Sequence, residues 1–135
     1  MNIQYFRGTI LIAFIIFNAS LAHSQRTTEM YIPIGQSPGL SGKNTLVGFI
    51  RKVDAKSLLI VIGDAKGDQQ VKVTKGTKIW LDRSQLKLTN QEGTLADCKE
   101  NILAEVKPTG GEKKDQMIAE WIKVQISEIG PASEK

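Results

Sequence analysis

From Thr45 to Ile126, short apolar segments alternate with clusters of turn-forming residues, and this spacing constrains the fold more than any other feature of the chain. Short strands separated by turns about every eight to twelve residues are typical of a small β-barrel or sandwich. The sequence therefore predicts an all-β domain over residues 45–127. Its five to six strands are expected within residues 46–53, 58–62, 71–74, 77–81, 102–106 and 117–126.

Two breaks in the apolar alternation favour a barrel over a sandwich. Ile50 and Val53 lie three residues apart in the first strand, and Ala119 and Ile122 repeat this spacing in the last one. Because successive strand residues point to opposite faces, an odd spacing between two core residues predicts a β-bulge. Bulges bend strands around a barrel, so both segments are expected to curve.

A long connection with one helical turn precedes the final two strands. Thr94 can cap a turn over residues 95–99, and Asn101 lies where a left-handed residue would end it. This layout matches an OB-type barrel. The predicted fold is a small OB-like barrel, closed or partly open, with one short helical turn.

The first 24 residues have the pattern of a secretory signal. Arg7 is the only charge in the first 22 residues, an apolar run follows at residues 10–17, and small residues then surround Ala22 and Ser24. This pattern predicts a cleavable signal helix over residues 1–24, cut after Ala22 or after Ser24, and a periplasmic or secreted protein. An uncleaved anchor is the less favoured alternative, because the run is shorter than the about 20 apolar residues that span a bilayer.

Residues 25–44 are expected to form an arm outside the barrel. Prolines and glycines in this segment disfavour a helix and interrupt any long strand. Its apolar patch, residues 30–32, is expected to pack against the barrel as an extra edge strand. Residues 128–135 are expected to form a flexible tail.

Several parts of the barrel region share a pattern with known sequences, namely residues 48–54, 58–61, 71–79, 95–101 and 119–124. Together they resemble a bacterial family of exported domains of unknown function. The resemblance implies an OB-like β-barrel and supplies no catalytic residues. Cys98 and Asn101 depart from the family pattern, which has leucine and glycine there, and both changes are compatible with the same fold.

The reactive side chains of this sequence are few. Cys98 is the one cysteine and His23 the one histidine, which excludes disulfide frameworks, multi-thiolate zinc sites and sites with two imidazoles. Residues 35–39 spell G-x-S-x-G, but no histidine base lies downstream and Pro38 lacks the N–H that an oxyanion hole needs. Cys98 is expected to be buried and inert, with an intermolecular disulfide as the alternative. We therefore expect no enzyme, no metal and no cofactor.

A binding surface is predicted from aromatic and basic residues on one face of the barrel. Alternation places Trp121 and Lys123 opposite Ile122 and Val124, and Trp80 opposite its apolar neighbours. OB-like barrels bind extended polymers with aromatic faces and basic rims. The candidate binding residues are Trp121, Trp80, Lys123, Lys78 and Tyr31. The alternative is that both tryptophans pack in the core or beneath the arm.

Two functions are compatible with this composition. The net charge of +4 is diffuse and interleaved with acidic residues, which disfavours nucleic acid as the partner. The first hypothesis is an exported, non-catalytic binding module for an envelope polymer or protein. The second is a structural or interaction protein that pairs through its arm or an open barrel edge. Membrane contact is expected only through the signal segment, if that segment stays uncleaved.

Overall fold

The computed structural model describes residues 28–110 and 116–128. The predicted signal segment and nearly all of the predicted tail lie outside this range. No helix among the described residues has the length and apolar character needed to cross a membrane.

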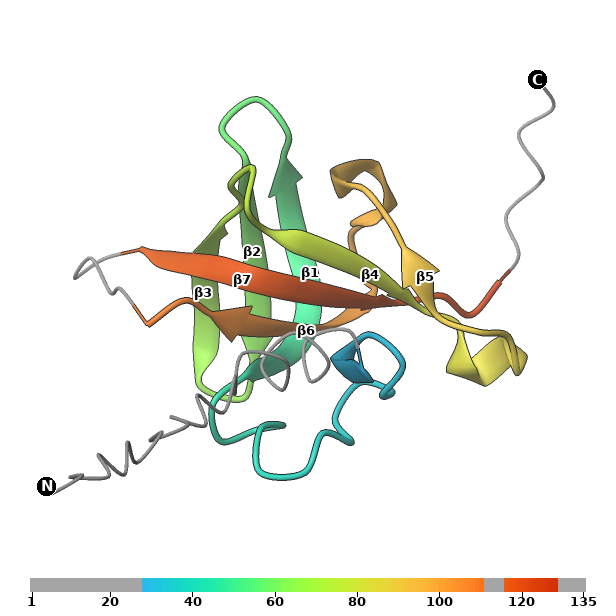
Figure 1. Cartoon of the computed structure of the whole chain (residues 1–135). Helices are drawn as coiled ribbons and strands as arrows, with labels where there is room; N and C mark the ends of the chain where they lie inside the picture. The colour runs from blue at the N-terminus through green and yellow to red at the C-terminus, as the bar shows by residue number, and fades with distance from the viewer. Residues whose placement is uncertain (1–27, 111–115, 129–135) are drawn as a thin grey trace, which may run out of the picture.

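Seven strands and two 3-10 turns make up the described part of the chain (Figure 1). In chain order they are β1 (Leu46–Asp54), β2 (Leu59–Asp64), β3 (Gly67–Lys72), β4 (Lys78–Asp82), η1 (Ser84–Leu86), β5 (Gln91–Glu92), η2 (Leu95–Asp97), β6 (Leu103–Pro108) and β7 (Met117–Gln125).

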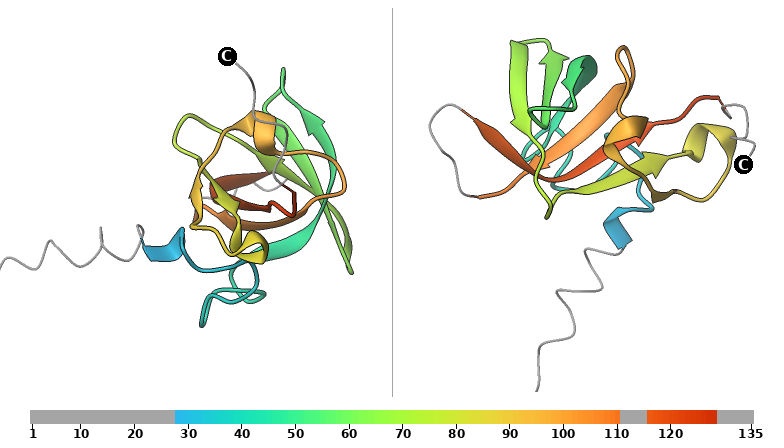
Figure 2. Two further views of the ribbon diagram at one scale, coloured as in Figure 1. Left: turned by 90° about the vertical axis from the view of Figure 1, so that its right-hand side faces the viewer. Right: turned by 90° about the horizontal axis from the view of Figure 1, so that it is seen from above.

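The strands close into a barrel. They pair in the order β3-β2-β1-β6-β7-β4-β5, and β3 also pairs with β7, so that β1, β2, β3, β7 and β6 form a ring (Figure 2). Both β3 and β4 run parallel to β7, β3 at Val71 and Lys72 and β4 along its whole length. They therefore act as two halves of one interrupted strand. The fold is all-β, with a five-stranded OB-like barrel and two extra strands, as the sequence predicts.

Both predicted bulges are present. The β1–β2 register shifts between Ile50 and Lys52, and the β6–β7 register shifts between Lys107 and Pro108. In β7 the shift leaves Glu120 as the extra residue, since Lys107 faces Trp121 and Pro108 faces Ala119. Each bulge reverses the alternation of sides and so keeps apolar residues inside the barrel on both sides of the bend.

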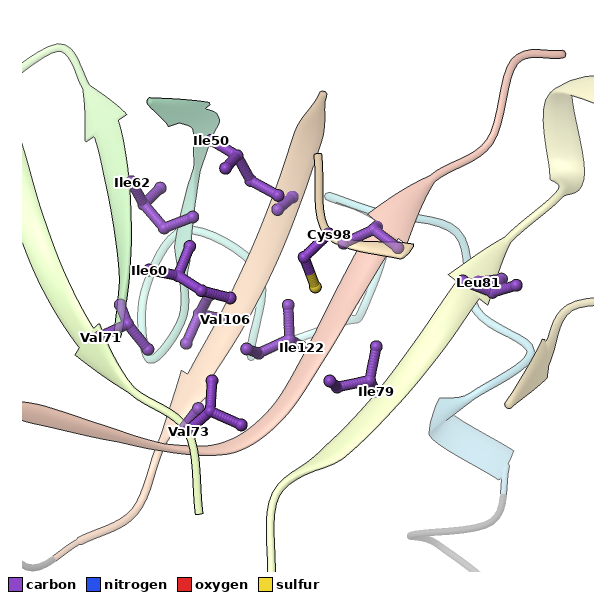
Figure 3. Close-up of a cluster of buried hydrophobic side chains, with 13 residues drawn as sticks. Ile50, Ile60, Ile62, Val71, Val73, Ile79, Leu81, Cys98, Val106 and Ile122 are labelled. Atoms are coloured by element: carbon purple, nitrogen blue, oxygen red, sulfur yellow. The ribbon is translucent and has the colours of Figure 1, made fainter. Parts of the chain in front are cut away.

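The inward-facing side chains form a continuous apolar core (Figure 3). Burying one such aliphatic side chain contributes about 1.5–3 kcal/mol. The buried members are Ile50, Ile60, Ile62, Val71, Val73, Ile79, Leu81, Cys98, Ala104, Val106, Ala119, Ile122 and Val124.

The predicted helical turn is confirmed as η2. The backbone N–H of Thr94 donates to Asp97 Oδ2 at 2.7 Å, which closes the start of the turn. Asn101 adopts the left-handed conformation expected of it, with φ of 65°. The turn supplies Cys98 to the barrel core (Figure 3).

The expectation of an extra edge strand in the arm is wrong. The described arm residues, 28–44, form a short helical turn followed by consecutive turns. Gly35, Gly39 and Gly42 have φ between 73° and 79°, the left-handed region that reverses the chain and that strand residues do not adopt. The arm still packs on the outside of the barrel (Figure 1).

The close approach of β1 and β2 yields a first prediction. A Cβ added at Gly48 would lie 2.3 Å from the carbonyl oxygen of Gly63, which is backbone and cannot rotate away. We expect Gly48→Ala to lower the free energy of unfolding by about 1–3 kcal/mol in urea denaturation, because overpacking forces the strands apart. At Gly76 an added Cβ meets nothing closer than 3.7 Å, so Gly76→Ala is the control. Equal effects of the two substitutions would contradict the explanation.

Candidate functional site

Three of the predicted binding residues lie together on the outer surface of the barrel. Trp80 of β4 faces Lys123 of β7 in the sheet register, and Trp121 lies two residues before Lys123 on the same side of β7. The two indole ring centroids are 5.4 Å apart, at an interplanar angle of 30°. The Lys123 ammonium lies over the Trp121 ring, 4.6 Å from its centroid. The predicted shared face is therefore confirmed.

These three residues are buried. Trp80, Trp121 and Lys123 are 6%, 4% and 0% exposed, although they lie outside the apolar core cluster of the barrel. The arm covers them, as the alternative interpretation of the sequence proposed. Strand alternation directs these three side chains outward, but the arm excludes water from them. Lys123 contacts Glu29 and Ile32, which lie about 90 residues earlier in the chain.

The remaining two candidates are at the surface. Lys78 of β4 faces Trp121 in register but is exposed, and Tyr31 belongs to the arm and is 51% exposed. The structure therefore brings three of the five residues into one cluster and leaves two outside it. A binding role for all five stays a prediction.

The buried Lys123 ammonium is held mainly by the arm. Its Nζ donates to Glu29 Oε1 at 2.6 Å and to the Ile32 carbonyl at 3.0 Å, and Ser37 Oγ lies 3.5 Å away. A desolvated charge costs several kcal/mol unless it is paired and hydrogen-bonded. These contacts meet that requirement.

Glu105 of β6 is a second buried charge on the same surface and directly faces Lys123 in the β6–β7 register. Its Oε2 accepts the backbone N–H of Gly35 at 2.8 Å. Its Oε1 accepts the hydroxyls of Ser41 at 2.6 Å and Thr45 at 2.8 Å. One carboxylate therefore fastens the arm at Gly35 and Ser41 and also binds Thr45 at the start of the barrel.

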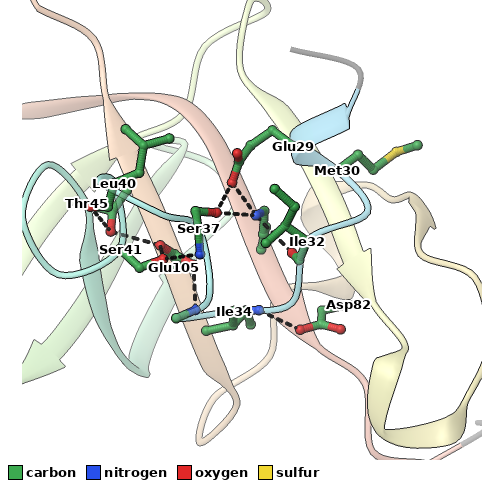
Figure 4. Close-up of polar contacts among 12 residues, drawn as sticks. Glu29, Met30, Ile32, Ile34, Ser37, Leu40, Ser41, Thr45, Asp82 and Glu105 are labelled. Atoms are coloured by element: carbon green, nitrogen blue, oxygen red, sulfur yellow. Dashed lines mark hydrogen bonds and ion pairs between the residues drawn. The ribbon is translucent and has the colours of Figure 1, made fainter. Parts of the chain in front are cut away.

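Two further side chains bind the main chain of the arm, and Figure 4 shows one of these contacts, between Ile34 and Asp82. Asp82 Oδ2 accepts the Ile34 N–H at 2.9 Å, and Asn90 Nδ2 donates to the Met30 carbonyl at 3.0 Å. Neighbouring barrel residues bind the remaining oxygen atoms of Asp82 and Asn90. Asp82 Oδ1 accepts both the N–H and the hydroxyl of Ser84. Asn90 Oδ1 accepts the N–H of Arg83. The pair is therefore held in place before it meets the arm.

We call the surface formed by Trp80, Asp82, Asn90, Glu105, Trp121 and Lys123 the arm face. Sequence reasoning missed three of its members: Asp82, Asn90 and Glu105. Outward-facing polar residues are usually solvated, so the residue types of Asp82, Asn90 and Glu105 do not indicate that these side chains bind the arm. The one available signal was the pairing of Glu105 with Lys123, which depends on a strand register that the sequence alone does not give.

The polar groups of the arm face are arranged as hydrogen-bond and ion-pair partners of the arm. Ser37, the serine of the G-x-S-x-G pattern, is buried and hydrogen-bonded to Glu29, with Lys123 beside it. Because the Lys123 amine donates to a carboxylate and a carbonyl, it is arranged as an ion-pair partner and not as a base for the serine. Within residues 28–110 and 116–128, no group of three or more His, Cys, Asp or Glu side chains is placed to hold a metal ion.

A hollow of about 680 Å³ lies elsewhere, between the β4–β5 connection and the end of β7. Its lining mixes aliphatic side chains such as Leu88 and Ile126 with Arg83, Lys99 and Glu128, so both signs of charge are present. Among the described residues, no buried side-chain polar atom lacks a partner that a ligand there would supply. The organised polar groups belong to the arm face.

Comparisons with known proteins give little. No family model matches the sequence, and no curated protein matches it significantly. Among solved structures, a tryptophan-to-alanine variant of CusF with Cu(II), from Escherichia coli, aligns with a TM-score of 0.41 and 15% identity. The alignment covers 59% of this chain and 88% of that one. This similarity is too low to carry over a ligand, and the family resemblance seen in the sequence stays a prediction.

Glu105→Gln tests whether this carboxylate fastens the arm. The amide replaces one acceptor oxygen with a donor, so at least one arm contact is lost, and we expect unfolding free energy to fall by about 2 kcal/mol. Trp80 and Trp121 are the chain's two tryptophans, so acrylamide quenching of fluorescence should rise as the arm loosens. Glu120→Gln is the control, because its pair with Lys107 is partly exposed and worth about 0–1 kcal/mol. Unchanged quenching in Glu105→Gln would contradict this role.

Cys98 yields a prediction about reactivity. Burial raises the pKa of its thiol to about 12, with Asp97 adding a smaller contribution of the same sign. The thiolate that reacts with disulfide reagents is therefore nearly absent at pH 8. We expect no reaction of the folded protein with Ellman's reagent and one thiol per chain after unfolding in guanidinium. Rapid reaction of the folded protein would show that Cys98 is accessible and would support the disulfide alternative.

Proposed function

We propose that the protein is a non-catalytic binding module that recognises a polypeptide segment through the arm face. The observation that carries this proposal is the binding of four main-chain groups of one segment by four fixed side chains. Asn90 and Lys123 donate to the carbonyls of Met30 and Ile32, while Asp82 and Glu105 accept the N–H groups of Ile34 and Gly35.

Main-chain groups are common to all polypeptides, so a surface that binds them is suited to segments of varied sequence. Two of the four contacts are to carbonyls and two are to N–H groups, and all four fall within six consecutive residues of the arm. The paired indoles of Trp80 and Trp121 add rigid apolar area, and aromatic side chains are enriched in protein interfaces. This composition favours an envelope protein over an envelope polymer as the partner.

The predicted binding residues fit this proposal in two groups. Trp80, Trp121 and Lys123 belong to the arm face itself. Lys78 pairs with Trp121 in register and is exposed beside it, and we propose that it contacts the partner. Tyr31 is exposed on the arm, and we propose that it contacts the partner from there. Export to the periplasm or the medium, indicated by the first 24 residues, is part of the same proposal.

In this structure the arm itself occupies the face. A tethered segment has an effective concentration of the order of mM, so an incoming segment has to compete with it. The partner's apparent affinity is therefore lowered by the arm. Weakening the arm's own contacts should expose the binding activity.

A second candidate function is strand pairing at an open edge of the barrel. β3 meets β7 only at Val71 and Lys72 among the described residues, and Gly67 to Gln70 are exposed. An unpaired edge can accept a strand from another chain. Such pairing would be independent of the arm face, so it should survive the substitutions described next.

The proposal is tested with the full chain carrying Glu29→Ala and Ile34→Pro. The first substitution removes the ion pair with Lys123, and the second removes the N–H that Asp82 accepts. A fluorescein-labelled peptide with the sequence of residues 26–42 should bind this variant at least about tenfold more tightly than the wild-type chain, as measured by anisotropy, because the tethered arm competes less.

Two controls make the test specific. A peptide with proline in place of Ile34 cannot donate to Asp82 and should bind about tenfold more weakly, as expected for a lost hydrogen bond to a charged group. The Gln36→Ala chain, altered at an exposed arm position, should behave like the wild type. Equal binding of both peptides would refute main-chain recognition. If the double variant does not fold by circular dichroism, the Glu29→Ala chain, in which every side chain of the arm face is unchanged, replaces it.

A further inference from the structure

The main-chain contacts of the arm face do not distinguish one sequence from another. One contact does, because it involves an ionised side chain of the arm: the ion pair between Glu29 and Lys123. The inference below concerns the specificity of this site and rests on the proposed function.

We propose that Lys123 is a carboxylate receptor, currently filled by Glu29, and that a partner segment is selected for a carboxylate that takes the place of Glu29. Two contacts within the barrel position this ammonium. The Lys123 Nζ lies over the Trp121 ring, and the β4–β7 pairing places Lys123 beside Trp80.

The hydrogen-bond geometry leaves room for one anion. The Ile32 carbonyl takes one of the three Nζ–H donors at 3.0 Å, and Ser37 Oγ lies nearest a second at 3.5 Å. Glu29 Oε1, at 2.6 Å, is the one anionic oxygen within bonding distance of Nζ among the described residues. An ammonium removed from water attracts an anion more strongly than an exposed lysine does.

The charge of the surroundings selects a singly charged group. Glu105 faces Lys123 directly in the β6–β7 register and is itself buried. A phosphate dianion at the receptor would bring a second negative charge close to the Glu105 carboxylate in a region of low dielectric, which is unfavourable. A carboxylate, from an acidic side chain or a chain terminus, avoids this repulsion.

Glu29→Ala provides a direct test, because it removes the carboxylate and leaves both the buried ammonium and the space. We expect the melting temperature of this variant to fall and then to rise saturably by several degrees when sodium acetate is added. Sodium chloride at the same ionic strength should not reproduce the rise, and the wild-type chain should not show it. The Glu29→Ala/Lys123→Met chain, which lacks the ammonium, is the matched control and should not respond. Equal effects of acetate and chloride on Glu29→Ala would overturn the receptor.

A second measurement keeps the test decisive if Glu29→Ala does not fold. The Ile34→Pro chain, in which Glu29 is unchanged, is titrated with two labelled peptides of residues 26–42, one with the natural glutamate and one with glutamine in its place. We expect the glutamine peptide to bind at least tenfold more weakly. Equal binding of the two peptides would overturn the receptor while leaving main-chain recognition intact. Acetate rescue without binding of either peptide would instead support the receptor and refute the proposed function.

Discussion

Two opposite charges on the outside of the barrel determine how the rest of the chain is arranged. Glu105 and Lys123 face one another in register on β6 and β7, and both are fully buried. Excluding them from water costs several kcal/mol for each ion unless hydrogen bonds replace the lost solvation. The arm supplies most of those bonds through Glu29, Ile32, Gly35 and Ser41, and Thr45 at the start of the barrel supplies one more. These bonds require the arm to follow a path of turns. In a strand, the main chain of the arm would hydrogen-bond to a neighbouring strand instead.

The core and the arm face depend on the same bulge in β7. Glu120 is the extra residue, and it sets which later residues point inward. Ile122 and Val124 then fill the barrel, while Trp121 and Lys123 are directed outward to the arm. If Glu120 were paired regularly in the strand, the alternation after it would shift by one residue and place Lys123 in the apolar core. Fold and candidate site are therefore specified by one local irregularity.

The parts of the structure that could be predicted are those encoded locally. The spacing of Ile50 and Val53 revealed one bulge, and Asn101 marked the left-handed end of η2, because each depends on a few neighbouring residues. The sequence left open whether the tryptophans are covered, since this depends on contacts between Ile34 and Asp82, 48 residues apart, and between Gly35 and Glu105, 70 residues apart. Alternation gives the side of a strand on which a residue lies and carries no information on what covers that side.

A surface that binds main-chain groups and contains two tryptophans is prone to unspecific association when it is uncovered. A tethered occupant prevents this at low cost, because it dissociates and rebinds within the same molecule. Only a segment that matches the main-chain contacts and also offers an anion to Lys123 gains enough to replace it. If the proposed function holds, the arm sets the affinity that a partner segment needs in order to displace it. The Lys123 ammonium, now paired with Glu29, then favours segments that carry a carboxylate.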